Sequence, residues 1–470
     1  MSLNFKRLAG LMLAAAIVGA PAASAWAQEA PPPAEAMVEE SSPVADAAPA
    51  VEAPAEVVEE VVEEEVATID SGDTAWMLTS TALVLMMTIP GLALFYGGMV
   101  RKKNVIATVA QSFAITAVMS VLWMVVGYSL AFSENGNAAL NPFVGGLSNA
   151  FLSGVSYEGV SGSIPEYLFV VFQMTFFIIT PALITGAFAE RMKFSAMLLF
   201  MVLWSLVVYA PVCHWVWGGG FLSEEGVLDF AGGTVVHINA GVAGLVCAIV
   251  LGKRKGYGVE NMAPHNLVLT MIGAALLWVG WFGFNAGSAV AANGLAAVAM
   301  LNTQVATAGA VVSWMIIEWV ERKKPGMLGL ASGAIAGLVA ITPAAGFVSP
   351  QGALIIGVIG GAAAYVGAVW LKKLLKYDDS LDVFGVHGIA GIVGAILTGV
   401  LVDAAIVGEE TAAAASPITQ FIGVLGTVAW SAIASFVILM ICKFTTGLRV
   451  SEEEEVEGLD LSQHGESLHE

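Results

Sequence analysis

Long apolar runs recur along most of this chain, and they constrain its fold more than any other feature. Eleven of them follow one another from Thr74, separated by short polar breaks, at about 74–99, 105–132, 166–188, 195–217, 230–252, 266–289, 300–320, 327–347, 352–371, 383–406 and 419–442. A helix of roughly 20 apolar residues crosses about 30 Å of hydrocarbon. The runs lack the alternating ten-residue pattern of a membrane barrel. The sequence therefore predicts an all-α polytopic membrane protein with eleven transmembrane helices.

The composition and the distribution of charge agree with a membrane-embedded body. Only 12% of the residues are charged, against roughly a quarter in a soluble globular protein. The formal net charge of -20 excludes nucleic acid as a partner, because an acidic protein repels phosphate. Residues 28–73 hold 14 acids and residues 451–470 hold 8, both without a base, which leaves 16 acids and 16 bases in residues 74–450. The net charge thus belongs to the two flanking segments.

The bases of the body predict its orientation. They fall in six places, each after an odd-numbered run: Arg101 to Lys103, Arg191 with Lys193, Lys253 to Lys255, Arg322 to Lys324, Lys372 with Lys373 and Lys376, and Lys443 with Arg449. Cytoplasmic loops are enriched in Lys and Arg. We therefore expect a multi-pass protein of the inner membrane, with its mature amino terminus outside and its carboxyl terminus in the cytoplasm.

The amino end is typical of a segment that is removed after export. In residues 1–27, Lys6 and Arg7 precede a short apolar run and then small residues that allow cleavage after Ala25 or Ala27. This is the layout of a secretory signal peptide. The alternative, an uncleaved first membrane helix, is disfavoured because the apolar run is too short to span a bilayer.

The remaining chain divides into three parts. Residues 28–73 are rich in Ala, Pro, Val and Glu, and such a segment buries too little apolar surface to fold, so we expect a disordered extracytoplasmic linker. Residues 74–446 are the expected membrane domain, and residues 447–470 are the expected cytoplasmic tail.

No pattern predicts an enzyme, a cofactor or a metal site. Cys213, Cys247 and Cys442 lie in or at the edges of apolar runs without metal-ligand spacing, and they are interpreted as buried small hydrophobes. The glycines Gly218 to Gly220 form no phosphate loop, because the Lys-Ser/Thr pair of such loops is missing.

A repeat in the sequence pairs two histidines. His237 and His387 each begin the pattern H-x-x-A-G-x-x-G, and an acid precedes each of them, Asp229 by eight residues and Asp382 by five. One histidine lies early in the fifth run and the other early in the tenth, so the second copy has inverted topology. Inverted repeats bring paired functional elements together near the middle of the membrane.

Two adjacent imidazoles in an apolar setting have a chemical use. Ionisable groups inside a membrane are costly and are functional candidates, and histidine exchanges its proton near neutral pH. His237 and His387 are therefore expected to hold or pass a proton in a dry pore. The alternative is two separate core histidines, which the matched pair disfavours. The small residues three, four and seven positions after each histidine allow close helix packing.

Aromatic and polar residues cluster in the third to sixth runs. They are Phe176 in the third, Trp217 at the end of the fourth, Asp229 at the start of the fifth, and Phe284 with Ser288 in the sixth. An aromatic face with a hydroxyl and a carboxylate can concentrate a small cation. Taken singly, Trp217 is typical of an interfacial belt, and the phenylalanines are typical of a core.

Together these features resemble the ammonium transporter (Amt) family, within the wider Amt/Rh group. The resemblance covers roughly residues 74–470 and rests on the segments Leu92 to Gly98, Ala210 to Gly220, Asp229 to His237, Gly280 to Ser288, Asp382 to Gly388 and Glu457 to Glu466. It implies an inverted five-plus-five repeat of helices with an eleventh helix, assembled as a homotrimer with one narrow pore per subunit. The acidic linker is not part of the family pattern.

The resemblance also implies a role for individual residues. It maps an outer recruitment site to Trp217, Phe176 and Ser288 with Tyr209 close by, a gate to Phe176 and Phe284, a pore with a proton relay to His237 and His387, and a supporting acid to Asp229. The implied substrate is ammonium or ammonia, with methylammonium as an analogue. In this hypothesis ammonium loses its proton near Asp229, ammonia passes the gate, and the proton follows through the histidines.

The tail segment Glu457 to Glu466 resembles a family segment that orders against the cytoplasmic face and supports inhibition by PII-type signal proteins. Its candidate regulatory residues are Gly458, Asp460, His464 and Gly465. The preceding run Glu452 to Glu455, taken alone, is interpreted as a solvated acidic face.

The sequence leaves two other functions open. A Rh-type channel for ammonia or carbon dioxide is the near alternative, and Trp217 disfavours it because that group generally lacks the outer tryptophan. An ammonium sensor is the distant alternative. It would need an output domain, and only 28 residues follow the eleventh run.

Overall fold

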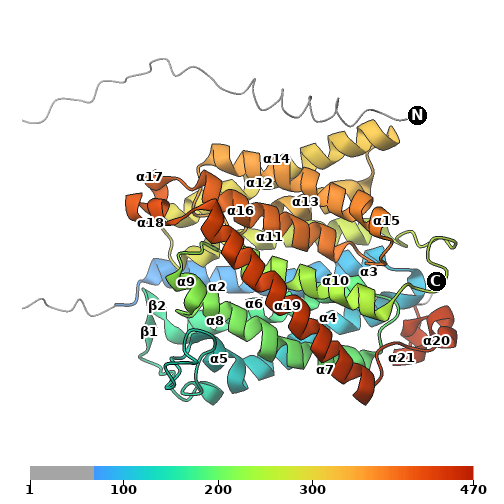
Figure 1. The fold of residues 1–470 in the computed structure, drawn as a ribbon, viewed down its shortest axis with the longest axis horizontal. Coiled ribbons are helices and arrows are strands. Elements are labelled where there is room, and N and C mark those ends of the chain that lie inside the picture. The colour runs from blue at the N-terminus through green and yellow to red at the C-terminus, as the bar shows by residue number, and fades with distance from the viewer. Residues whose placement is uncertain (1–67, 469–470) are drawn as a thin grey trace, which may run out of the picture. The chain divides into compact units, whose positions relative to one another are not determined.

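The computed structural model describes residues 68–468, which are almost entirely helical (Figure 1). The predicted signal peptide (1–27) and most of the predicted linker lie outside the described residues. With η marking π or 3-10 turns, the elements are α2 (Ser71–Met86), η1 (Met87–Leu92), α3 (Ala93–Met99), η2 (Lys102–Asn104), α4 (Val105–Leu122), η3 (Trp123–Gly127), α5 (Tyr128–Phe132), η4 (Ala150–Leu152), β1 (Val160–Ser161), β2 (Ile164–Pro165), α6 (Glu166–Phe188), α7 (Phe194–Trp204), η5 (Ser205–Tyr209), α8 (Ala210–Trp217), α9 (Phe221–Glu224), η6 (Gly233–Ile238), α10 (Asn239–Leu251), α11 (Leu267–Ala286), η7 (Gly287–Ala289), α12 (Gly294–Arg322), α13 (Met327–Ile341), α14 (Pro350–Tyr365), η8 (Val366–Leu371), α15 (Lys372–Leu375), η9 (Phe384–Ile389), α16 (Ala390–Leu401), α17 (Ala404–Val407), α18 (Glu409–Ala414), α19 (Pro417–Thr445), α20 (Glu452–Glu457) and α21 (Leu459–His464).

Ten helices within residues 68–468 are long and apolar enough to cross a membrane. They are Ser71–Met99, Lys102–Phe132, Glu166–Phe188, Phe194–Glu224, Gly233–Leu251, Leu267–Ala289, Gly294–Arg322, Pro350–Leu375, Phe384–Leu401 and Pro417–Thr445. Together with the shorter apolar helix α13, they account for the eleven predicted runs and confirm the all-α polytopic class.

Helix α13 is shorter than the run that predicted it. It ends at Ile341, whereas the apolar run extends to 347. Pro343 follows the C-cap Thr342, and a proline there cannot continue a helix. The run stays apolar past this point because Ala344 and Ala345 are buried in the core rather than in a helix.

Helix α2 begins three residues before the predicted start at Thr74. Its N-cap Asp70 accepts a hydrogen bond from the backbone N–H of Asp73. A side-chain cap of this kind stabilises a helix start by about 1 kcal/mol. A hydropathy pattern does not register it, because the capping residues are polar.

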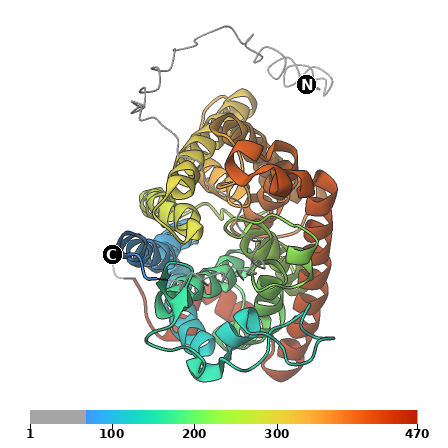
Figure 2. The ribbon, with the colours of Figure 1, turned by 90° about the vertical axis from the view of Figure 1, so that its left-hand side faces the viewer.

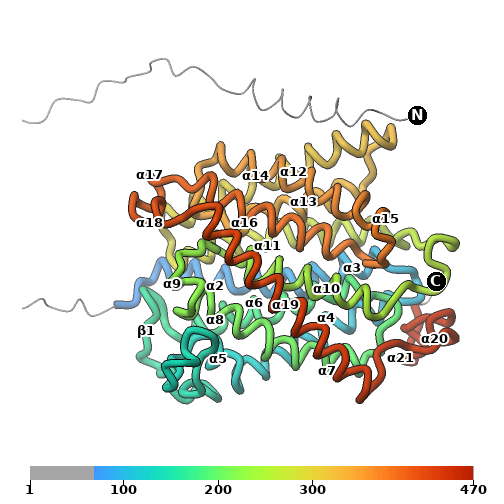
Figure 3. Tube along the Cα trace, in the orientation of Figure 1, coloured from blue at the N-terminus to red at the C-terminus, as the bar shows by residue number. Residues whose placement is uncertain are grey.

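In residues 68–468, the segments that connect the long helices lie in two groups, at opposite ends of those helices (Figure 1). β1, β2, α9, α17 and α18 lie at one end, and α15, α20 and α21 lie at the other. Seen along the helices, α19 lies on the outside of the bundle (Figure 2). The trace in Figure 3 shows that α19 crosses the other helices obliquely, and it packs on α10, α16 and α7.

Buried arginines join the connections at the α15 end. The guanidinium of Arg191 donates to the carbonyls of Ala187, Ala189, Gly252 and Asp378 and to the hydroxyl of Ser380. Burial alone would raise the pKa of Glu190, but the charges of Arg254 and Arg101 outweigh burial and hold that pKa below its ordinary value. The bases that predicted the orientation thus also hold this end together.

The two halves of the chain share a local irregularity. Both histidines lie in π-helical turns, His237 in η6 and His387 in η9. The preceding helix of each half also contains a π-helical turn, η5 in the first half and η8 in the second. Single π turns inside α-helices are rare and concentrate at functional sites. Their paired occurrence supports the repeat that the two sequence patterns indicated.

Candidate functional site

Five aromatic and imidazole rings form a continuous column from Trp217 to His387. Phe176 stands edge-on to Trp217 with centroids 5.9 Å apart, and its ring is tilted by 40° against that of Phe284 with centroids 4.4 Å apart. Phe284 lies 5.9 Å from His237, whose ring faces that of His387 at 5.4 Å. Trp217 is half-buried and the other four rings are buried. The column therefore leads from the surface near α9 into the interior.

The two histidines form a hydrogen-bonded pair. The Nδ1 atoms of His237 and His387 are 3.4 Å apart, which requires one of them to donate a proton and the other to accept it. The Nε2 atom of His237 has no hydrogen-bond partner among the described residues. A buried ring nitrogen without a partner can form a hydrogen bond with a bound small molecule that donates or accepts one.

Trp281 belongs to the column, although the sequence analysis did not single it out. Its ring stacks on His237 at 5.3 Å with an interplanar angle of 21°. Its Nε1–H donates to the hydroxyl of Thr342 at 2.9 Å, which holds the indole in this orientation. The signal was its spacing: Trp281 lies three residues before Phe284, so both project from one face of α11.

Asp229 supports the column from outside it. Its carboxylate accepts hydrogen bonds from the backbone N–H groups of Gly232, Gly233, Thr234 and Val235 and from the hydroxyl of Thr234. Its carbonyl accepts the Nε1–H of Trp217 at 2.8 Å. Asp229 thus stabilises the start of η6, which carries His237, and orients Trp217.

In the second half, the residue that corresponds to Asp229 is Asp379 and not Asp382. Asp379 precedes His387 by eight residues, the same offset as in the first half, and it accepts the backbone N–H of Phe384 at the start of η9. Burial, with the nearby charge of Asp382, raises the pKa of Asp379 to about 6. Asp382 pairs with Lys372 instead. Asp382 was expected from the sequence because it is the acid nearest to the repeated pattern.

The remaining recruitment residues differ in placement. Ser288 is half-buried and donates its hydroxyl proton to the carbonyl of Phe284 at 2.8 Å, so it lies one helical turn beyond Phe284. Tyr209 is fully buried, and its ring packs edge-on against Phe177 at 5.4 Å. It lies eight residues before Trp217, about 12 Å deeper along a helix, and makes no ring contact with the column.

The tail residues contact the ends of the transmembrane helices. Asp460 accepts the backbone N–H of Ala107 in the first turn of α4, and the ring of His464 stands edge-on to Phe194 at the start of α7. Gly458 has a φ of 112°, and a Cβ there would lie 2.6 Å from the carbonyl oxygen of Lys103. Gly465 ends α21 in the left-handed conformation.

The interpretation of Glu452 to Glu455 as a solvated run is wrong for Glu455. Its side chain is buried, accepts the backbone N–H of Lys255 at 2.6 Å, and pairs with Arg449 at 2.6 Å. Glu452 pairs with Lys255 but stays exposed. The run forms a helical turn closed by a capping box at Ser451 and Glu454, so only one of its four acids faces inward.

Comparison with known proteins identifies the family of this chain. The pattern of the Ammonium Transporter Family matches residues 75–468. The chain belongs to the ammonium transporter family. It is 51% identical over 411 residues to the ammonium transporter of Aquifex aeolicus, an alignment that covers 86% of this chain and 94% of that protein. It is likewise 51% identical over 408 residues to the ammonium transporter of Bacillus subtilis, covering 85% and 98%.

Solved structures agree with this assignment. The crystal structure of Saccharomyces cerevisiae Mep2 is similar with a TM-score of 0.75 at 35% identity, covering 82% of this chain and 89% of that one. A structure described as a sensor Amt protein is similar with a TM-score of 0.78 at 29% identity, covering 84% and 98%. The protein is therefore a multi-pass ammonium transporter and not an enzyme, and the paired histidines lie inside its helical bundle.

Proposed function

We propose that this transporter recruits ammonium at Trp217, Phe176 and Ser288, with Trp217 and Phe176 in ring contact at the half-buried end of the column. The rings of Trp217 and Phe176 attract a cation through their quadrupoles, by about 0.5–2 kcal/mol each. The hydroxyl of Ser288 donates its proton to the carbonyl of Phe284, so the lone pairs of its oxygen remain free to accept an N–H of ammonium. Trp217 is held for this role by the carbonyl of Asp229.

Passage inward requires ammonium to lose its proton. Beyond Trp217 the column is formed by the buried rings of Phe176 and Phe284, and removing an ion from water costs several kcal/mol. Neutral ammonia avoids most of that cost. Potassium has no proton to lose, so the same step gives selectivity. The fixed negative charge of Asp229 stabilises the cation just before the step.

The released proton follows through the two imidazoles in this proposal. The hydrogen bond between His237 and His387 supports it, because a proton can be accepted by one ring and released from the other without a bare charge in the pore. The observation that carries the proposed function is the unbroken ring column from the half-buried Trp217 to this pair.

We further propose that the α9 end faces outward and the α15 end faces the cytoplasm of a cell with an inner membrane. The loops that carry the base clusters Arg101 to Lys103 and Lys253 to Lys255 are joined at the α15 end, as the positive-inside rule requires. Residues 1–27 would then be a cleaved signal peptide and residues 28–73 an outer linker.

Homotrimeric assembly and regulation by a PII-type protein are proposed from the family resemblance. The tail offers a physical route for regulation, because Asp460 and His464 touch the starts of α4 and α7. A partner that pulled the tail away would remove both contacts.

The proposed mechanism is tested by currents from the full chain on a solid-supported membrane. We expect currents with ammonium and methylammonium and none with potassium. Exchange of both histidines, His237→Ala with His387→Ala, should reduce the ammonium current by about tenfold or more, since a positioned proton carrier contributes roughly 10²–10⁴. His265→Ala, at a histidine outside the column, is the control and should conduct normally.

Each alternative has its own result. Full and selective ammonium currents in the double variant would exclude the relay. Equal potassium and ammonium currents would exclude selection by deprotonation. Ammonia flux without any current would indicate a gas channel, and the absence of both would indicate a silent sensor.

A further inference from the structure

A cavity with four lysines lies at the α15 end of the molecule. Its volume is about 340 Å³, and Lys253, Lys372, Lys373 and Lys376 line it together with Tyr257. Lys253 and Tyr257 come from the loop after α10, and the other three lysines come from the end of the α14–α15 helix. No acid is among the residues that line it.

The charges of this cavity are poorly compensated. Lys372 pairs with Asp382, but Lys253, Lys373 and Lys376 form no ion pair within residues 68–468. The ammonium group of Lys253 lies 5.5 Å from the centre of the Tyr257 ring, which is a weak interaction at an exposed site.

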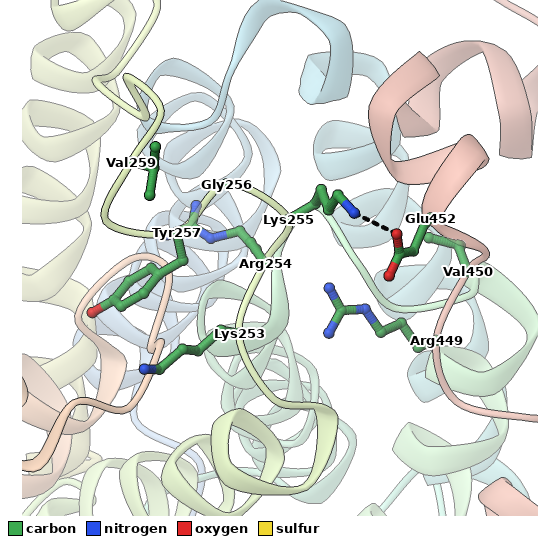
Figure 4. Close-up of a pocket in the computed structure, with 9 residues that line it drawn as sticks. All are labelled: Lys253, Arg254, Lys255, Gly256, Tyr257, Val259, Arg449, Val450 and Glu452. Carbon is green, nitrogen blue, oxygen red and sulfur yellow. Dashed lines mark hydrogen bonds and ion pairs between the residues drawn. The ribbon is translucent and has the colours of Figure 1, made fainter.

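The neighbouring cavity makes the contrast clear. It has a volume of about 510 Å³ and shares Lys253 and Tyr257, which extend away from Lys255 and Arg449 (Figure 4). In that cavity Lys255 pairs with Glu452, and Arg449 pairs with Glu455. The tail therefore neutralises one cavity and leaves the four-lysine cavity with an excess of positive charge.

We propose that the four-lysine cavity binds a phosphate group, which Lys253, Lys373 and Lys376 contact through charge-assisted hydrogen bonds. Ammonium groups bind phosphate as compact point charges with several donors. The three ammonium groups that line this cavity repel one another. A bound dianion attracts each of them and so offsets that repulsion. The phosphate is either free inorganic phosphate or the headgroup of an anionic lipid, since the cavity lies at the end of a membrane-spanning helix.

The cavity also touches the segment that leads to the pore. Lys372 donates to the carbonyl of Asp379 and pairs with Asp382, and Asp379 stabilises the start of η9, which carries His387. Lys372, which lines the phosphate site, thus contacts Asp379, and Asp379 in turn stabilises the start of the turn that carries His387. Its binding test below does not use transport, so it is independent of the proposed mechanism.

The first experiment measures binding to the full chain in nanodiscs at constant ionic strength. Radiolabelled inorganic phosphate is titrated in phosphatidylcholine discs, and retained phosphatidylglycerol is counted by native mass spectrometry in a parallel set. The variant Lys253→Gln, Lys373→Gln, Lys376→Gln removes the three unpaired charges. The control Lys323→Gln, Lys324→Gln removes two bases of the same end that line neither cavity.

We expect saturable binding that weakens at least about tenfold in the triple variant and less than twofold in the control. Saturation by inorganic phosphate identifies free phosphate as the ligand, and retention of phosphatidylglycerol alone identifies the lipid headgroup. Absence of both, or equal binding by the triple variant and the unmodified chain, would overturn the proposal.

A second measurement uses only the unmodified chain, in case the triple variant does not fold. Amine acylation is followed by mass spectrometry with inorganic phosphate present or absent, and in parallel with nanodiscs that contain or lack phosphatidylglycerol. Lys253, Lys373 and Lys376 should react at least severalfold more slowly with the ligand, and Lys323 and Lys324 should not change. If the ligand changed the acylation rate of none of the five lysines, or slowed all five equally, the result would contradict a phosphate site.

Discussion

The rings of His237 and His387 lie nearly parallel, with an interplanar angle of 22° and their Nδ1 atoms 3.4 Å apart. The two rings meet because their helices touch backbone to backbone. A Cβ on Gly241 would lie 2.3 Å from the backbone nitrogen of Gly388, a distance that no side chain tolerates. The expectation that small residues after each histidine serve close packing is confirmed at this position.

Gly241→Ala should therefore separate the two histidines. We expect a loss of about 1–3 kcal/mol in stability from overpacking and a fall of several-fold in the ammonium current. Thermal unfolding and solid-supported currents measure the two effects. Gly426→Ala in α19, where a Cβ would meet nothing within 4 Å, is the matched control. Normal currents in Gly241→Ala would show that the histidine contact does not depend on this approach.

Trp217→Leu should weaken ammonium recruitment. Loss of the indole removes one cation–π contact of about 0.5–1 kcal/mol or more, so the half-saturating ammonium concentration should rise about threefold to tenfold. The current measured against ammonium concentration tests this. Trp319→Leu, at a tryptophan on the exposed face of α12, should leave the half-saturation unchanged. If Trp217→Leu also left it unchanged, Trp217 would not belong to the recruitment site.

Asp379 should make stability depend on pH. Its pKa is raised from 3.8 to about 6 by burial and by Asp382, so the folded protein holds this proton more tightly than the unfolded chain. The resulting stability is fully present below about pH 4 and is lost as the pH rises through about 6. At 1.36 kcal/mol per pH unit, the loss is up to about 3 kcal/mol.

Asp379→Asn should abolish that dependence, because an amide has no proton to lose and still accepts the N–H of Phe384. The melting temperature of the variant relative to the unmodified chain should therefore be higher at pH 7 than at pH 4. Asp403→Asn changes another helix-capping aspartate, on the surface helix α17, and serves as control. If the difference in melting temperature between Asp379→Asn and the unmodified chain did not vary with pH, Asp379 would not be the group that makes stability depend on pH.

Glu455→Gln should loosen the tail. The substitution replaces a charged acceptor that binds Arg449 and the backbone of Lys255, at a cost of about 1.5–3 kcal/mol for hydrogen bonds to a charged group. Hydrogen exchange of residues 452–464 should accelerate about tenfold or more. Glu453→Gln, at an exposed position, should exchange as the unmodified chain does. Equal exchange in both variants would mean that Glu455 does not hold the tail.

Periodic and repeated features of this protein were predictable from its sequence. Apolar runs predicted the helices, and the repeated pattern brought His237 and His387 together across 150 residues. The partners of individual residues were less predictable. Trp281 and Asp379 were missed although the sequence carried a signal for each, the spacing of Trp281 to Phe284 and the eight-residue offset of Asp379 from His387. Glu455 was misread because its contact with the distant Lys255 leaves no mark on the neighbouring sequence.

Residue type and spacing alone determined the membrane-spanning helices, the pairing of the histidines and the aromatic residues of the column, because lipid allows only helices and inverted repeats meet at the centre. Tertiary structure alone decided which acid stabilises which helix start, how the rings stack, and which bases are left unpaired. Those outcomes depend on distances of a few ångströms between segments, since hydrogen bonds and ion pairs form only at contact. The cluster of Lys253, Lys373 and Lys376 shows the difference: in the sequence these bases indicate only orientation, whereas in the fold they surround one cavity.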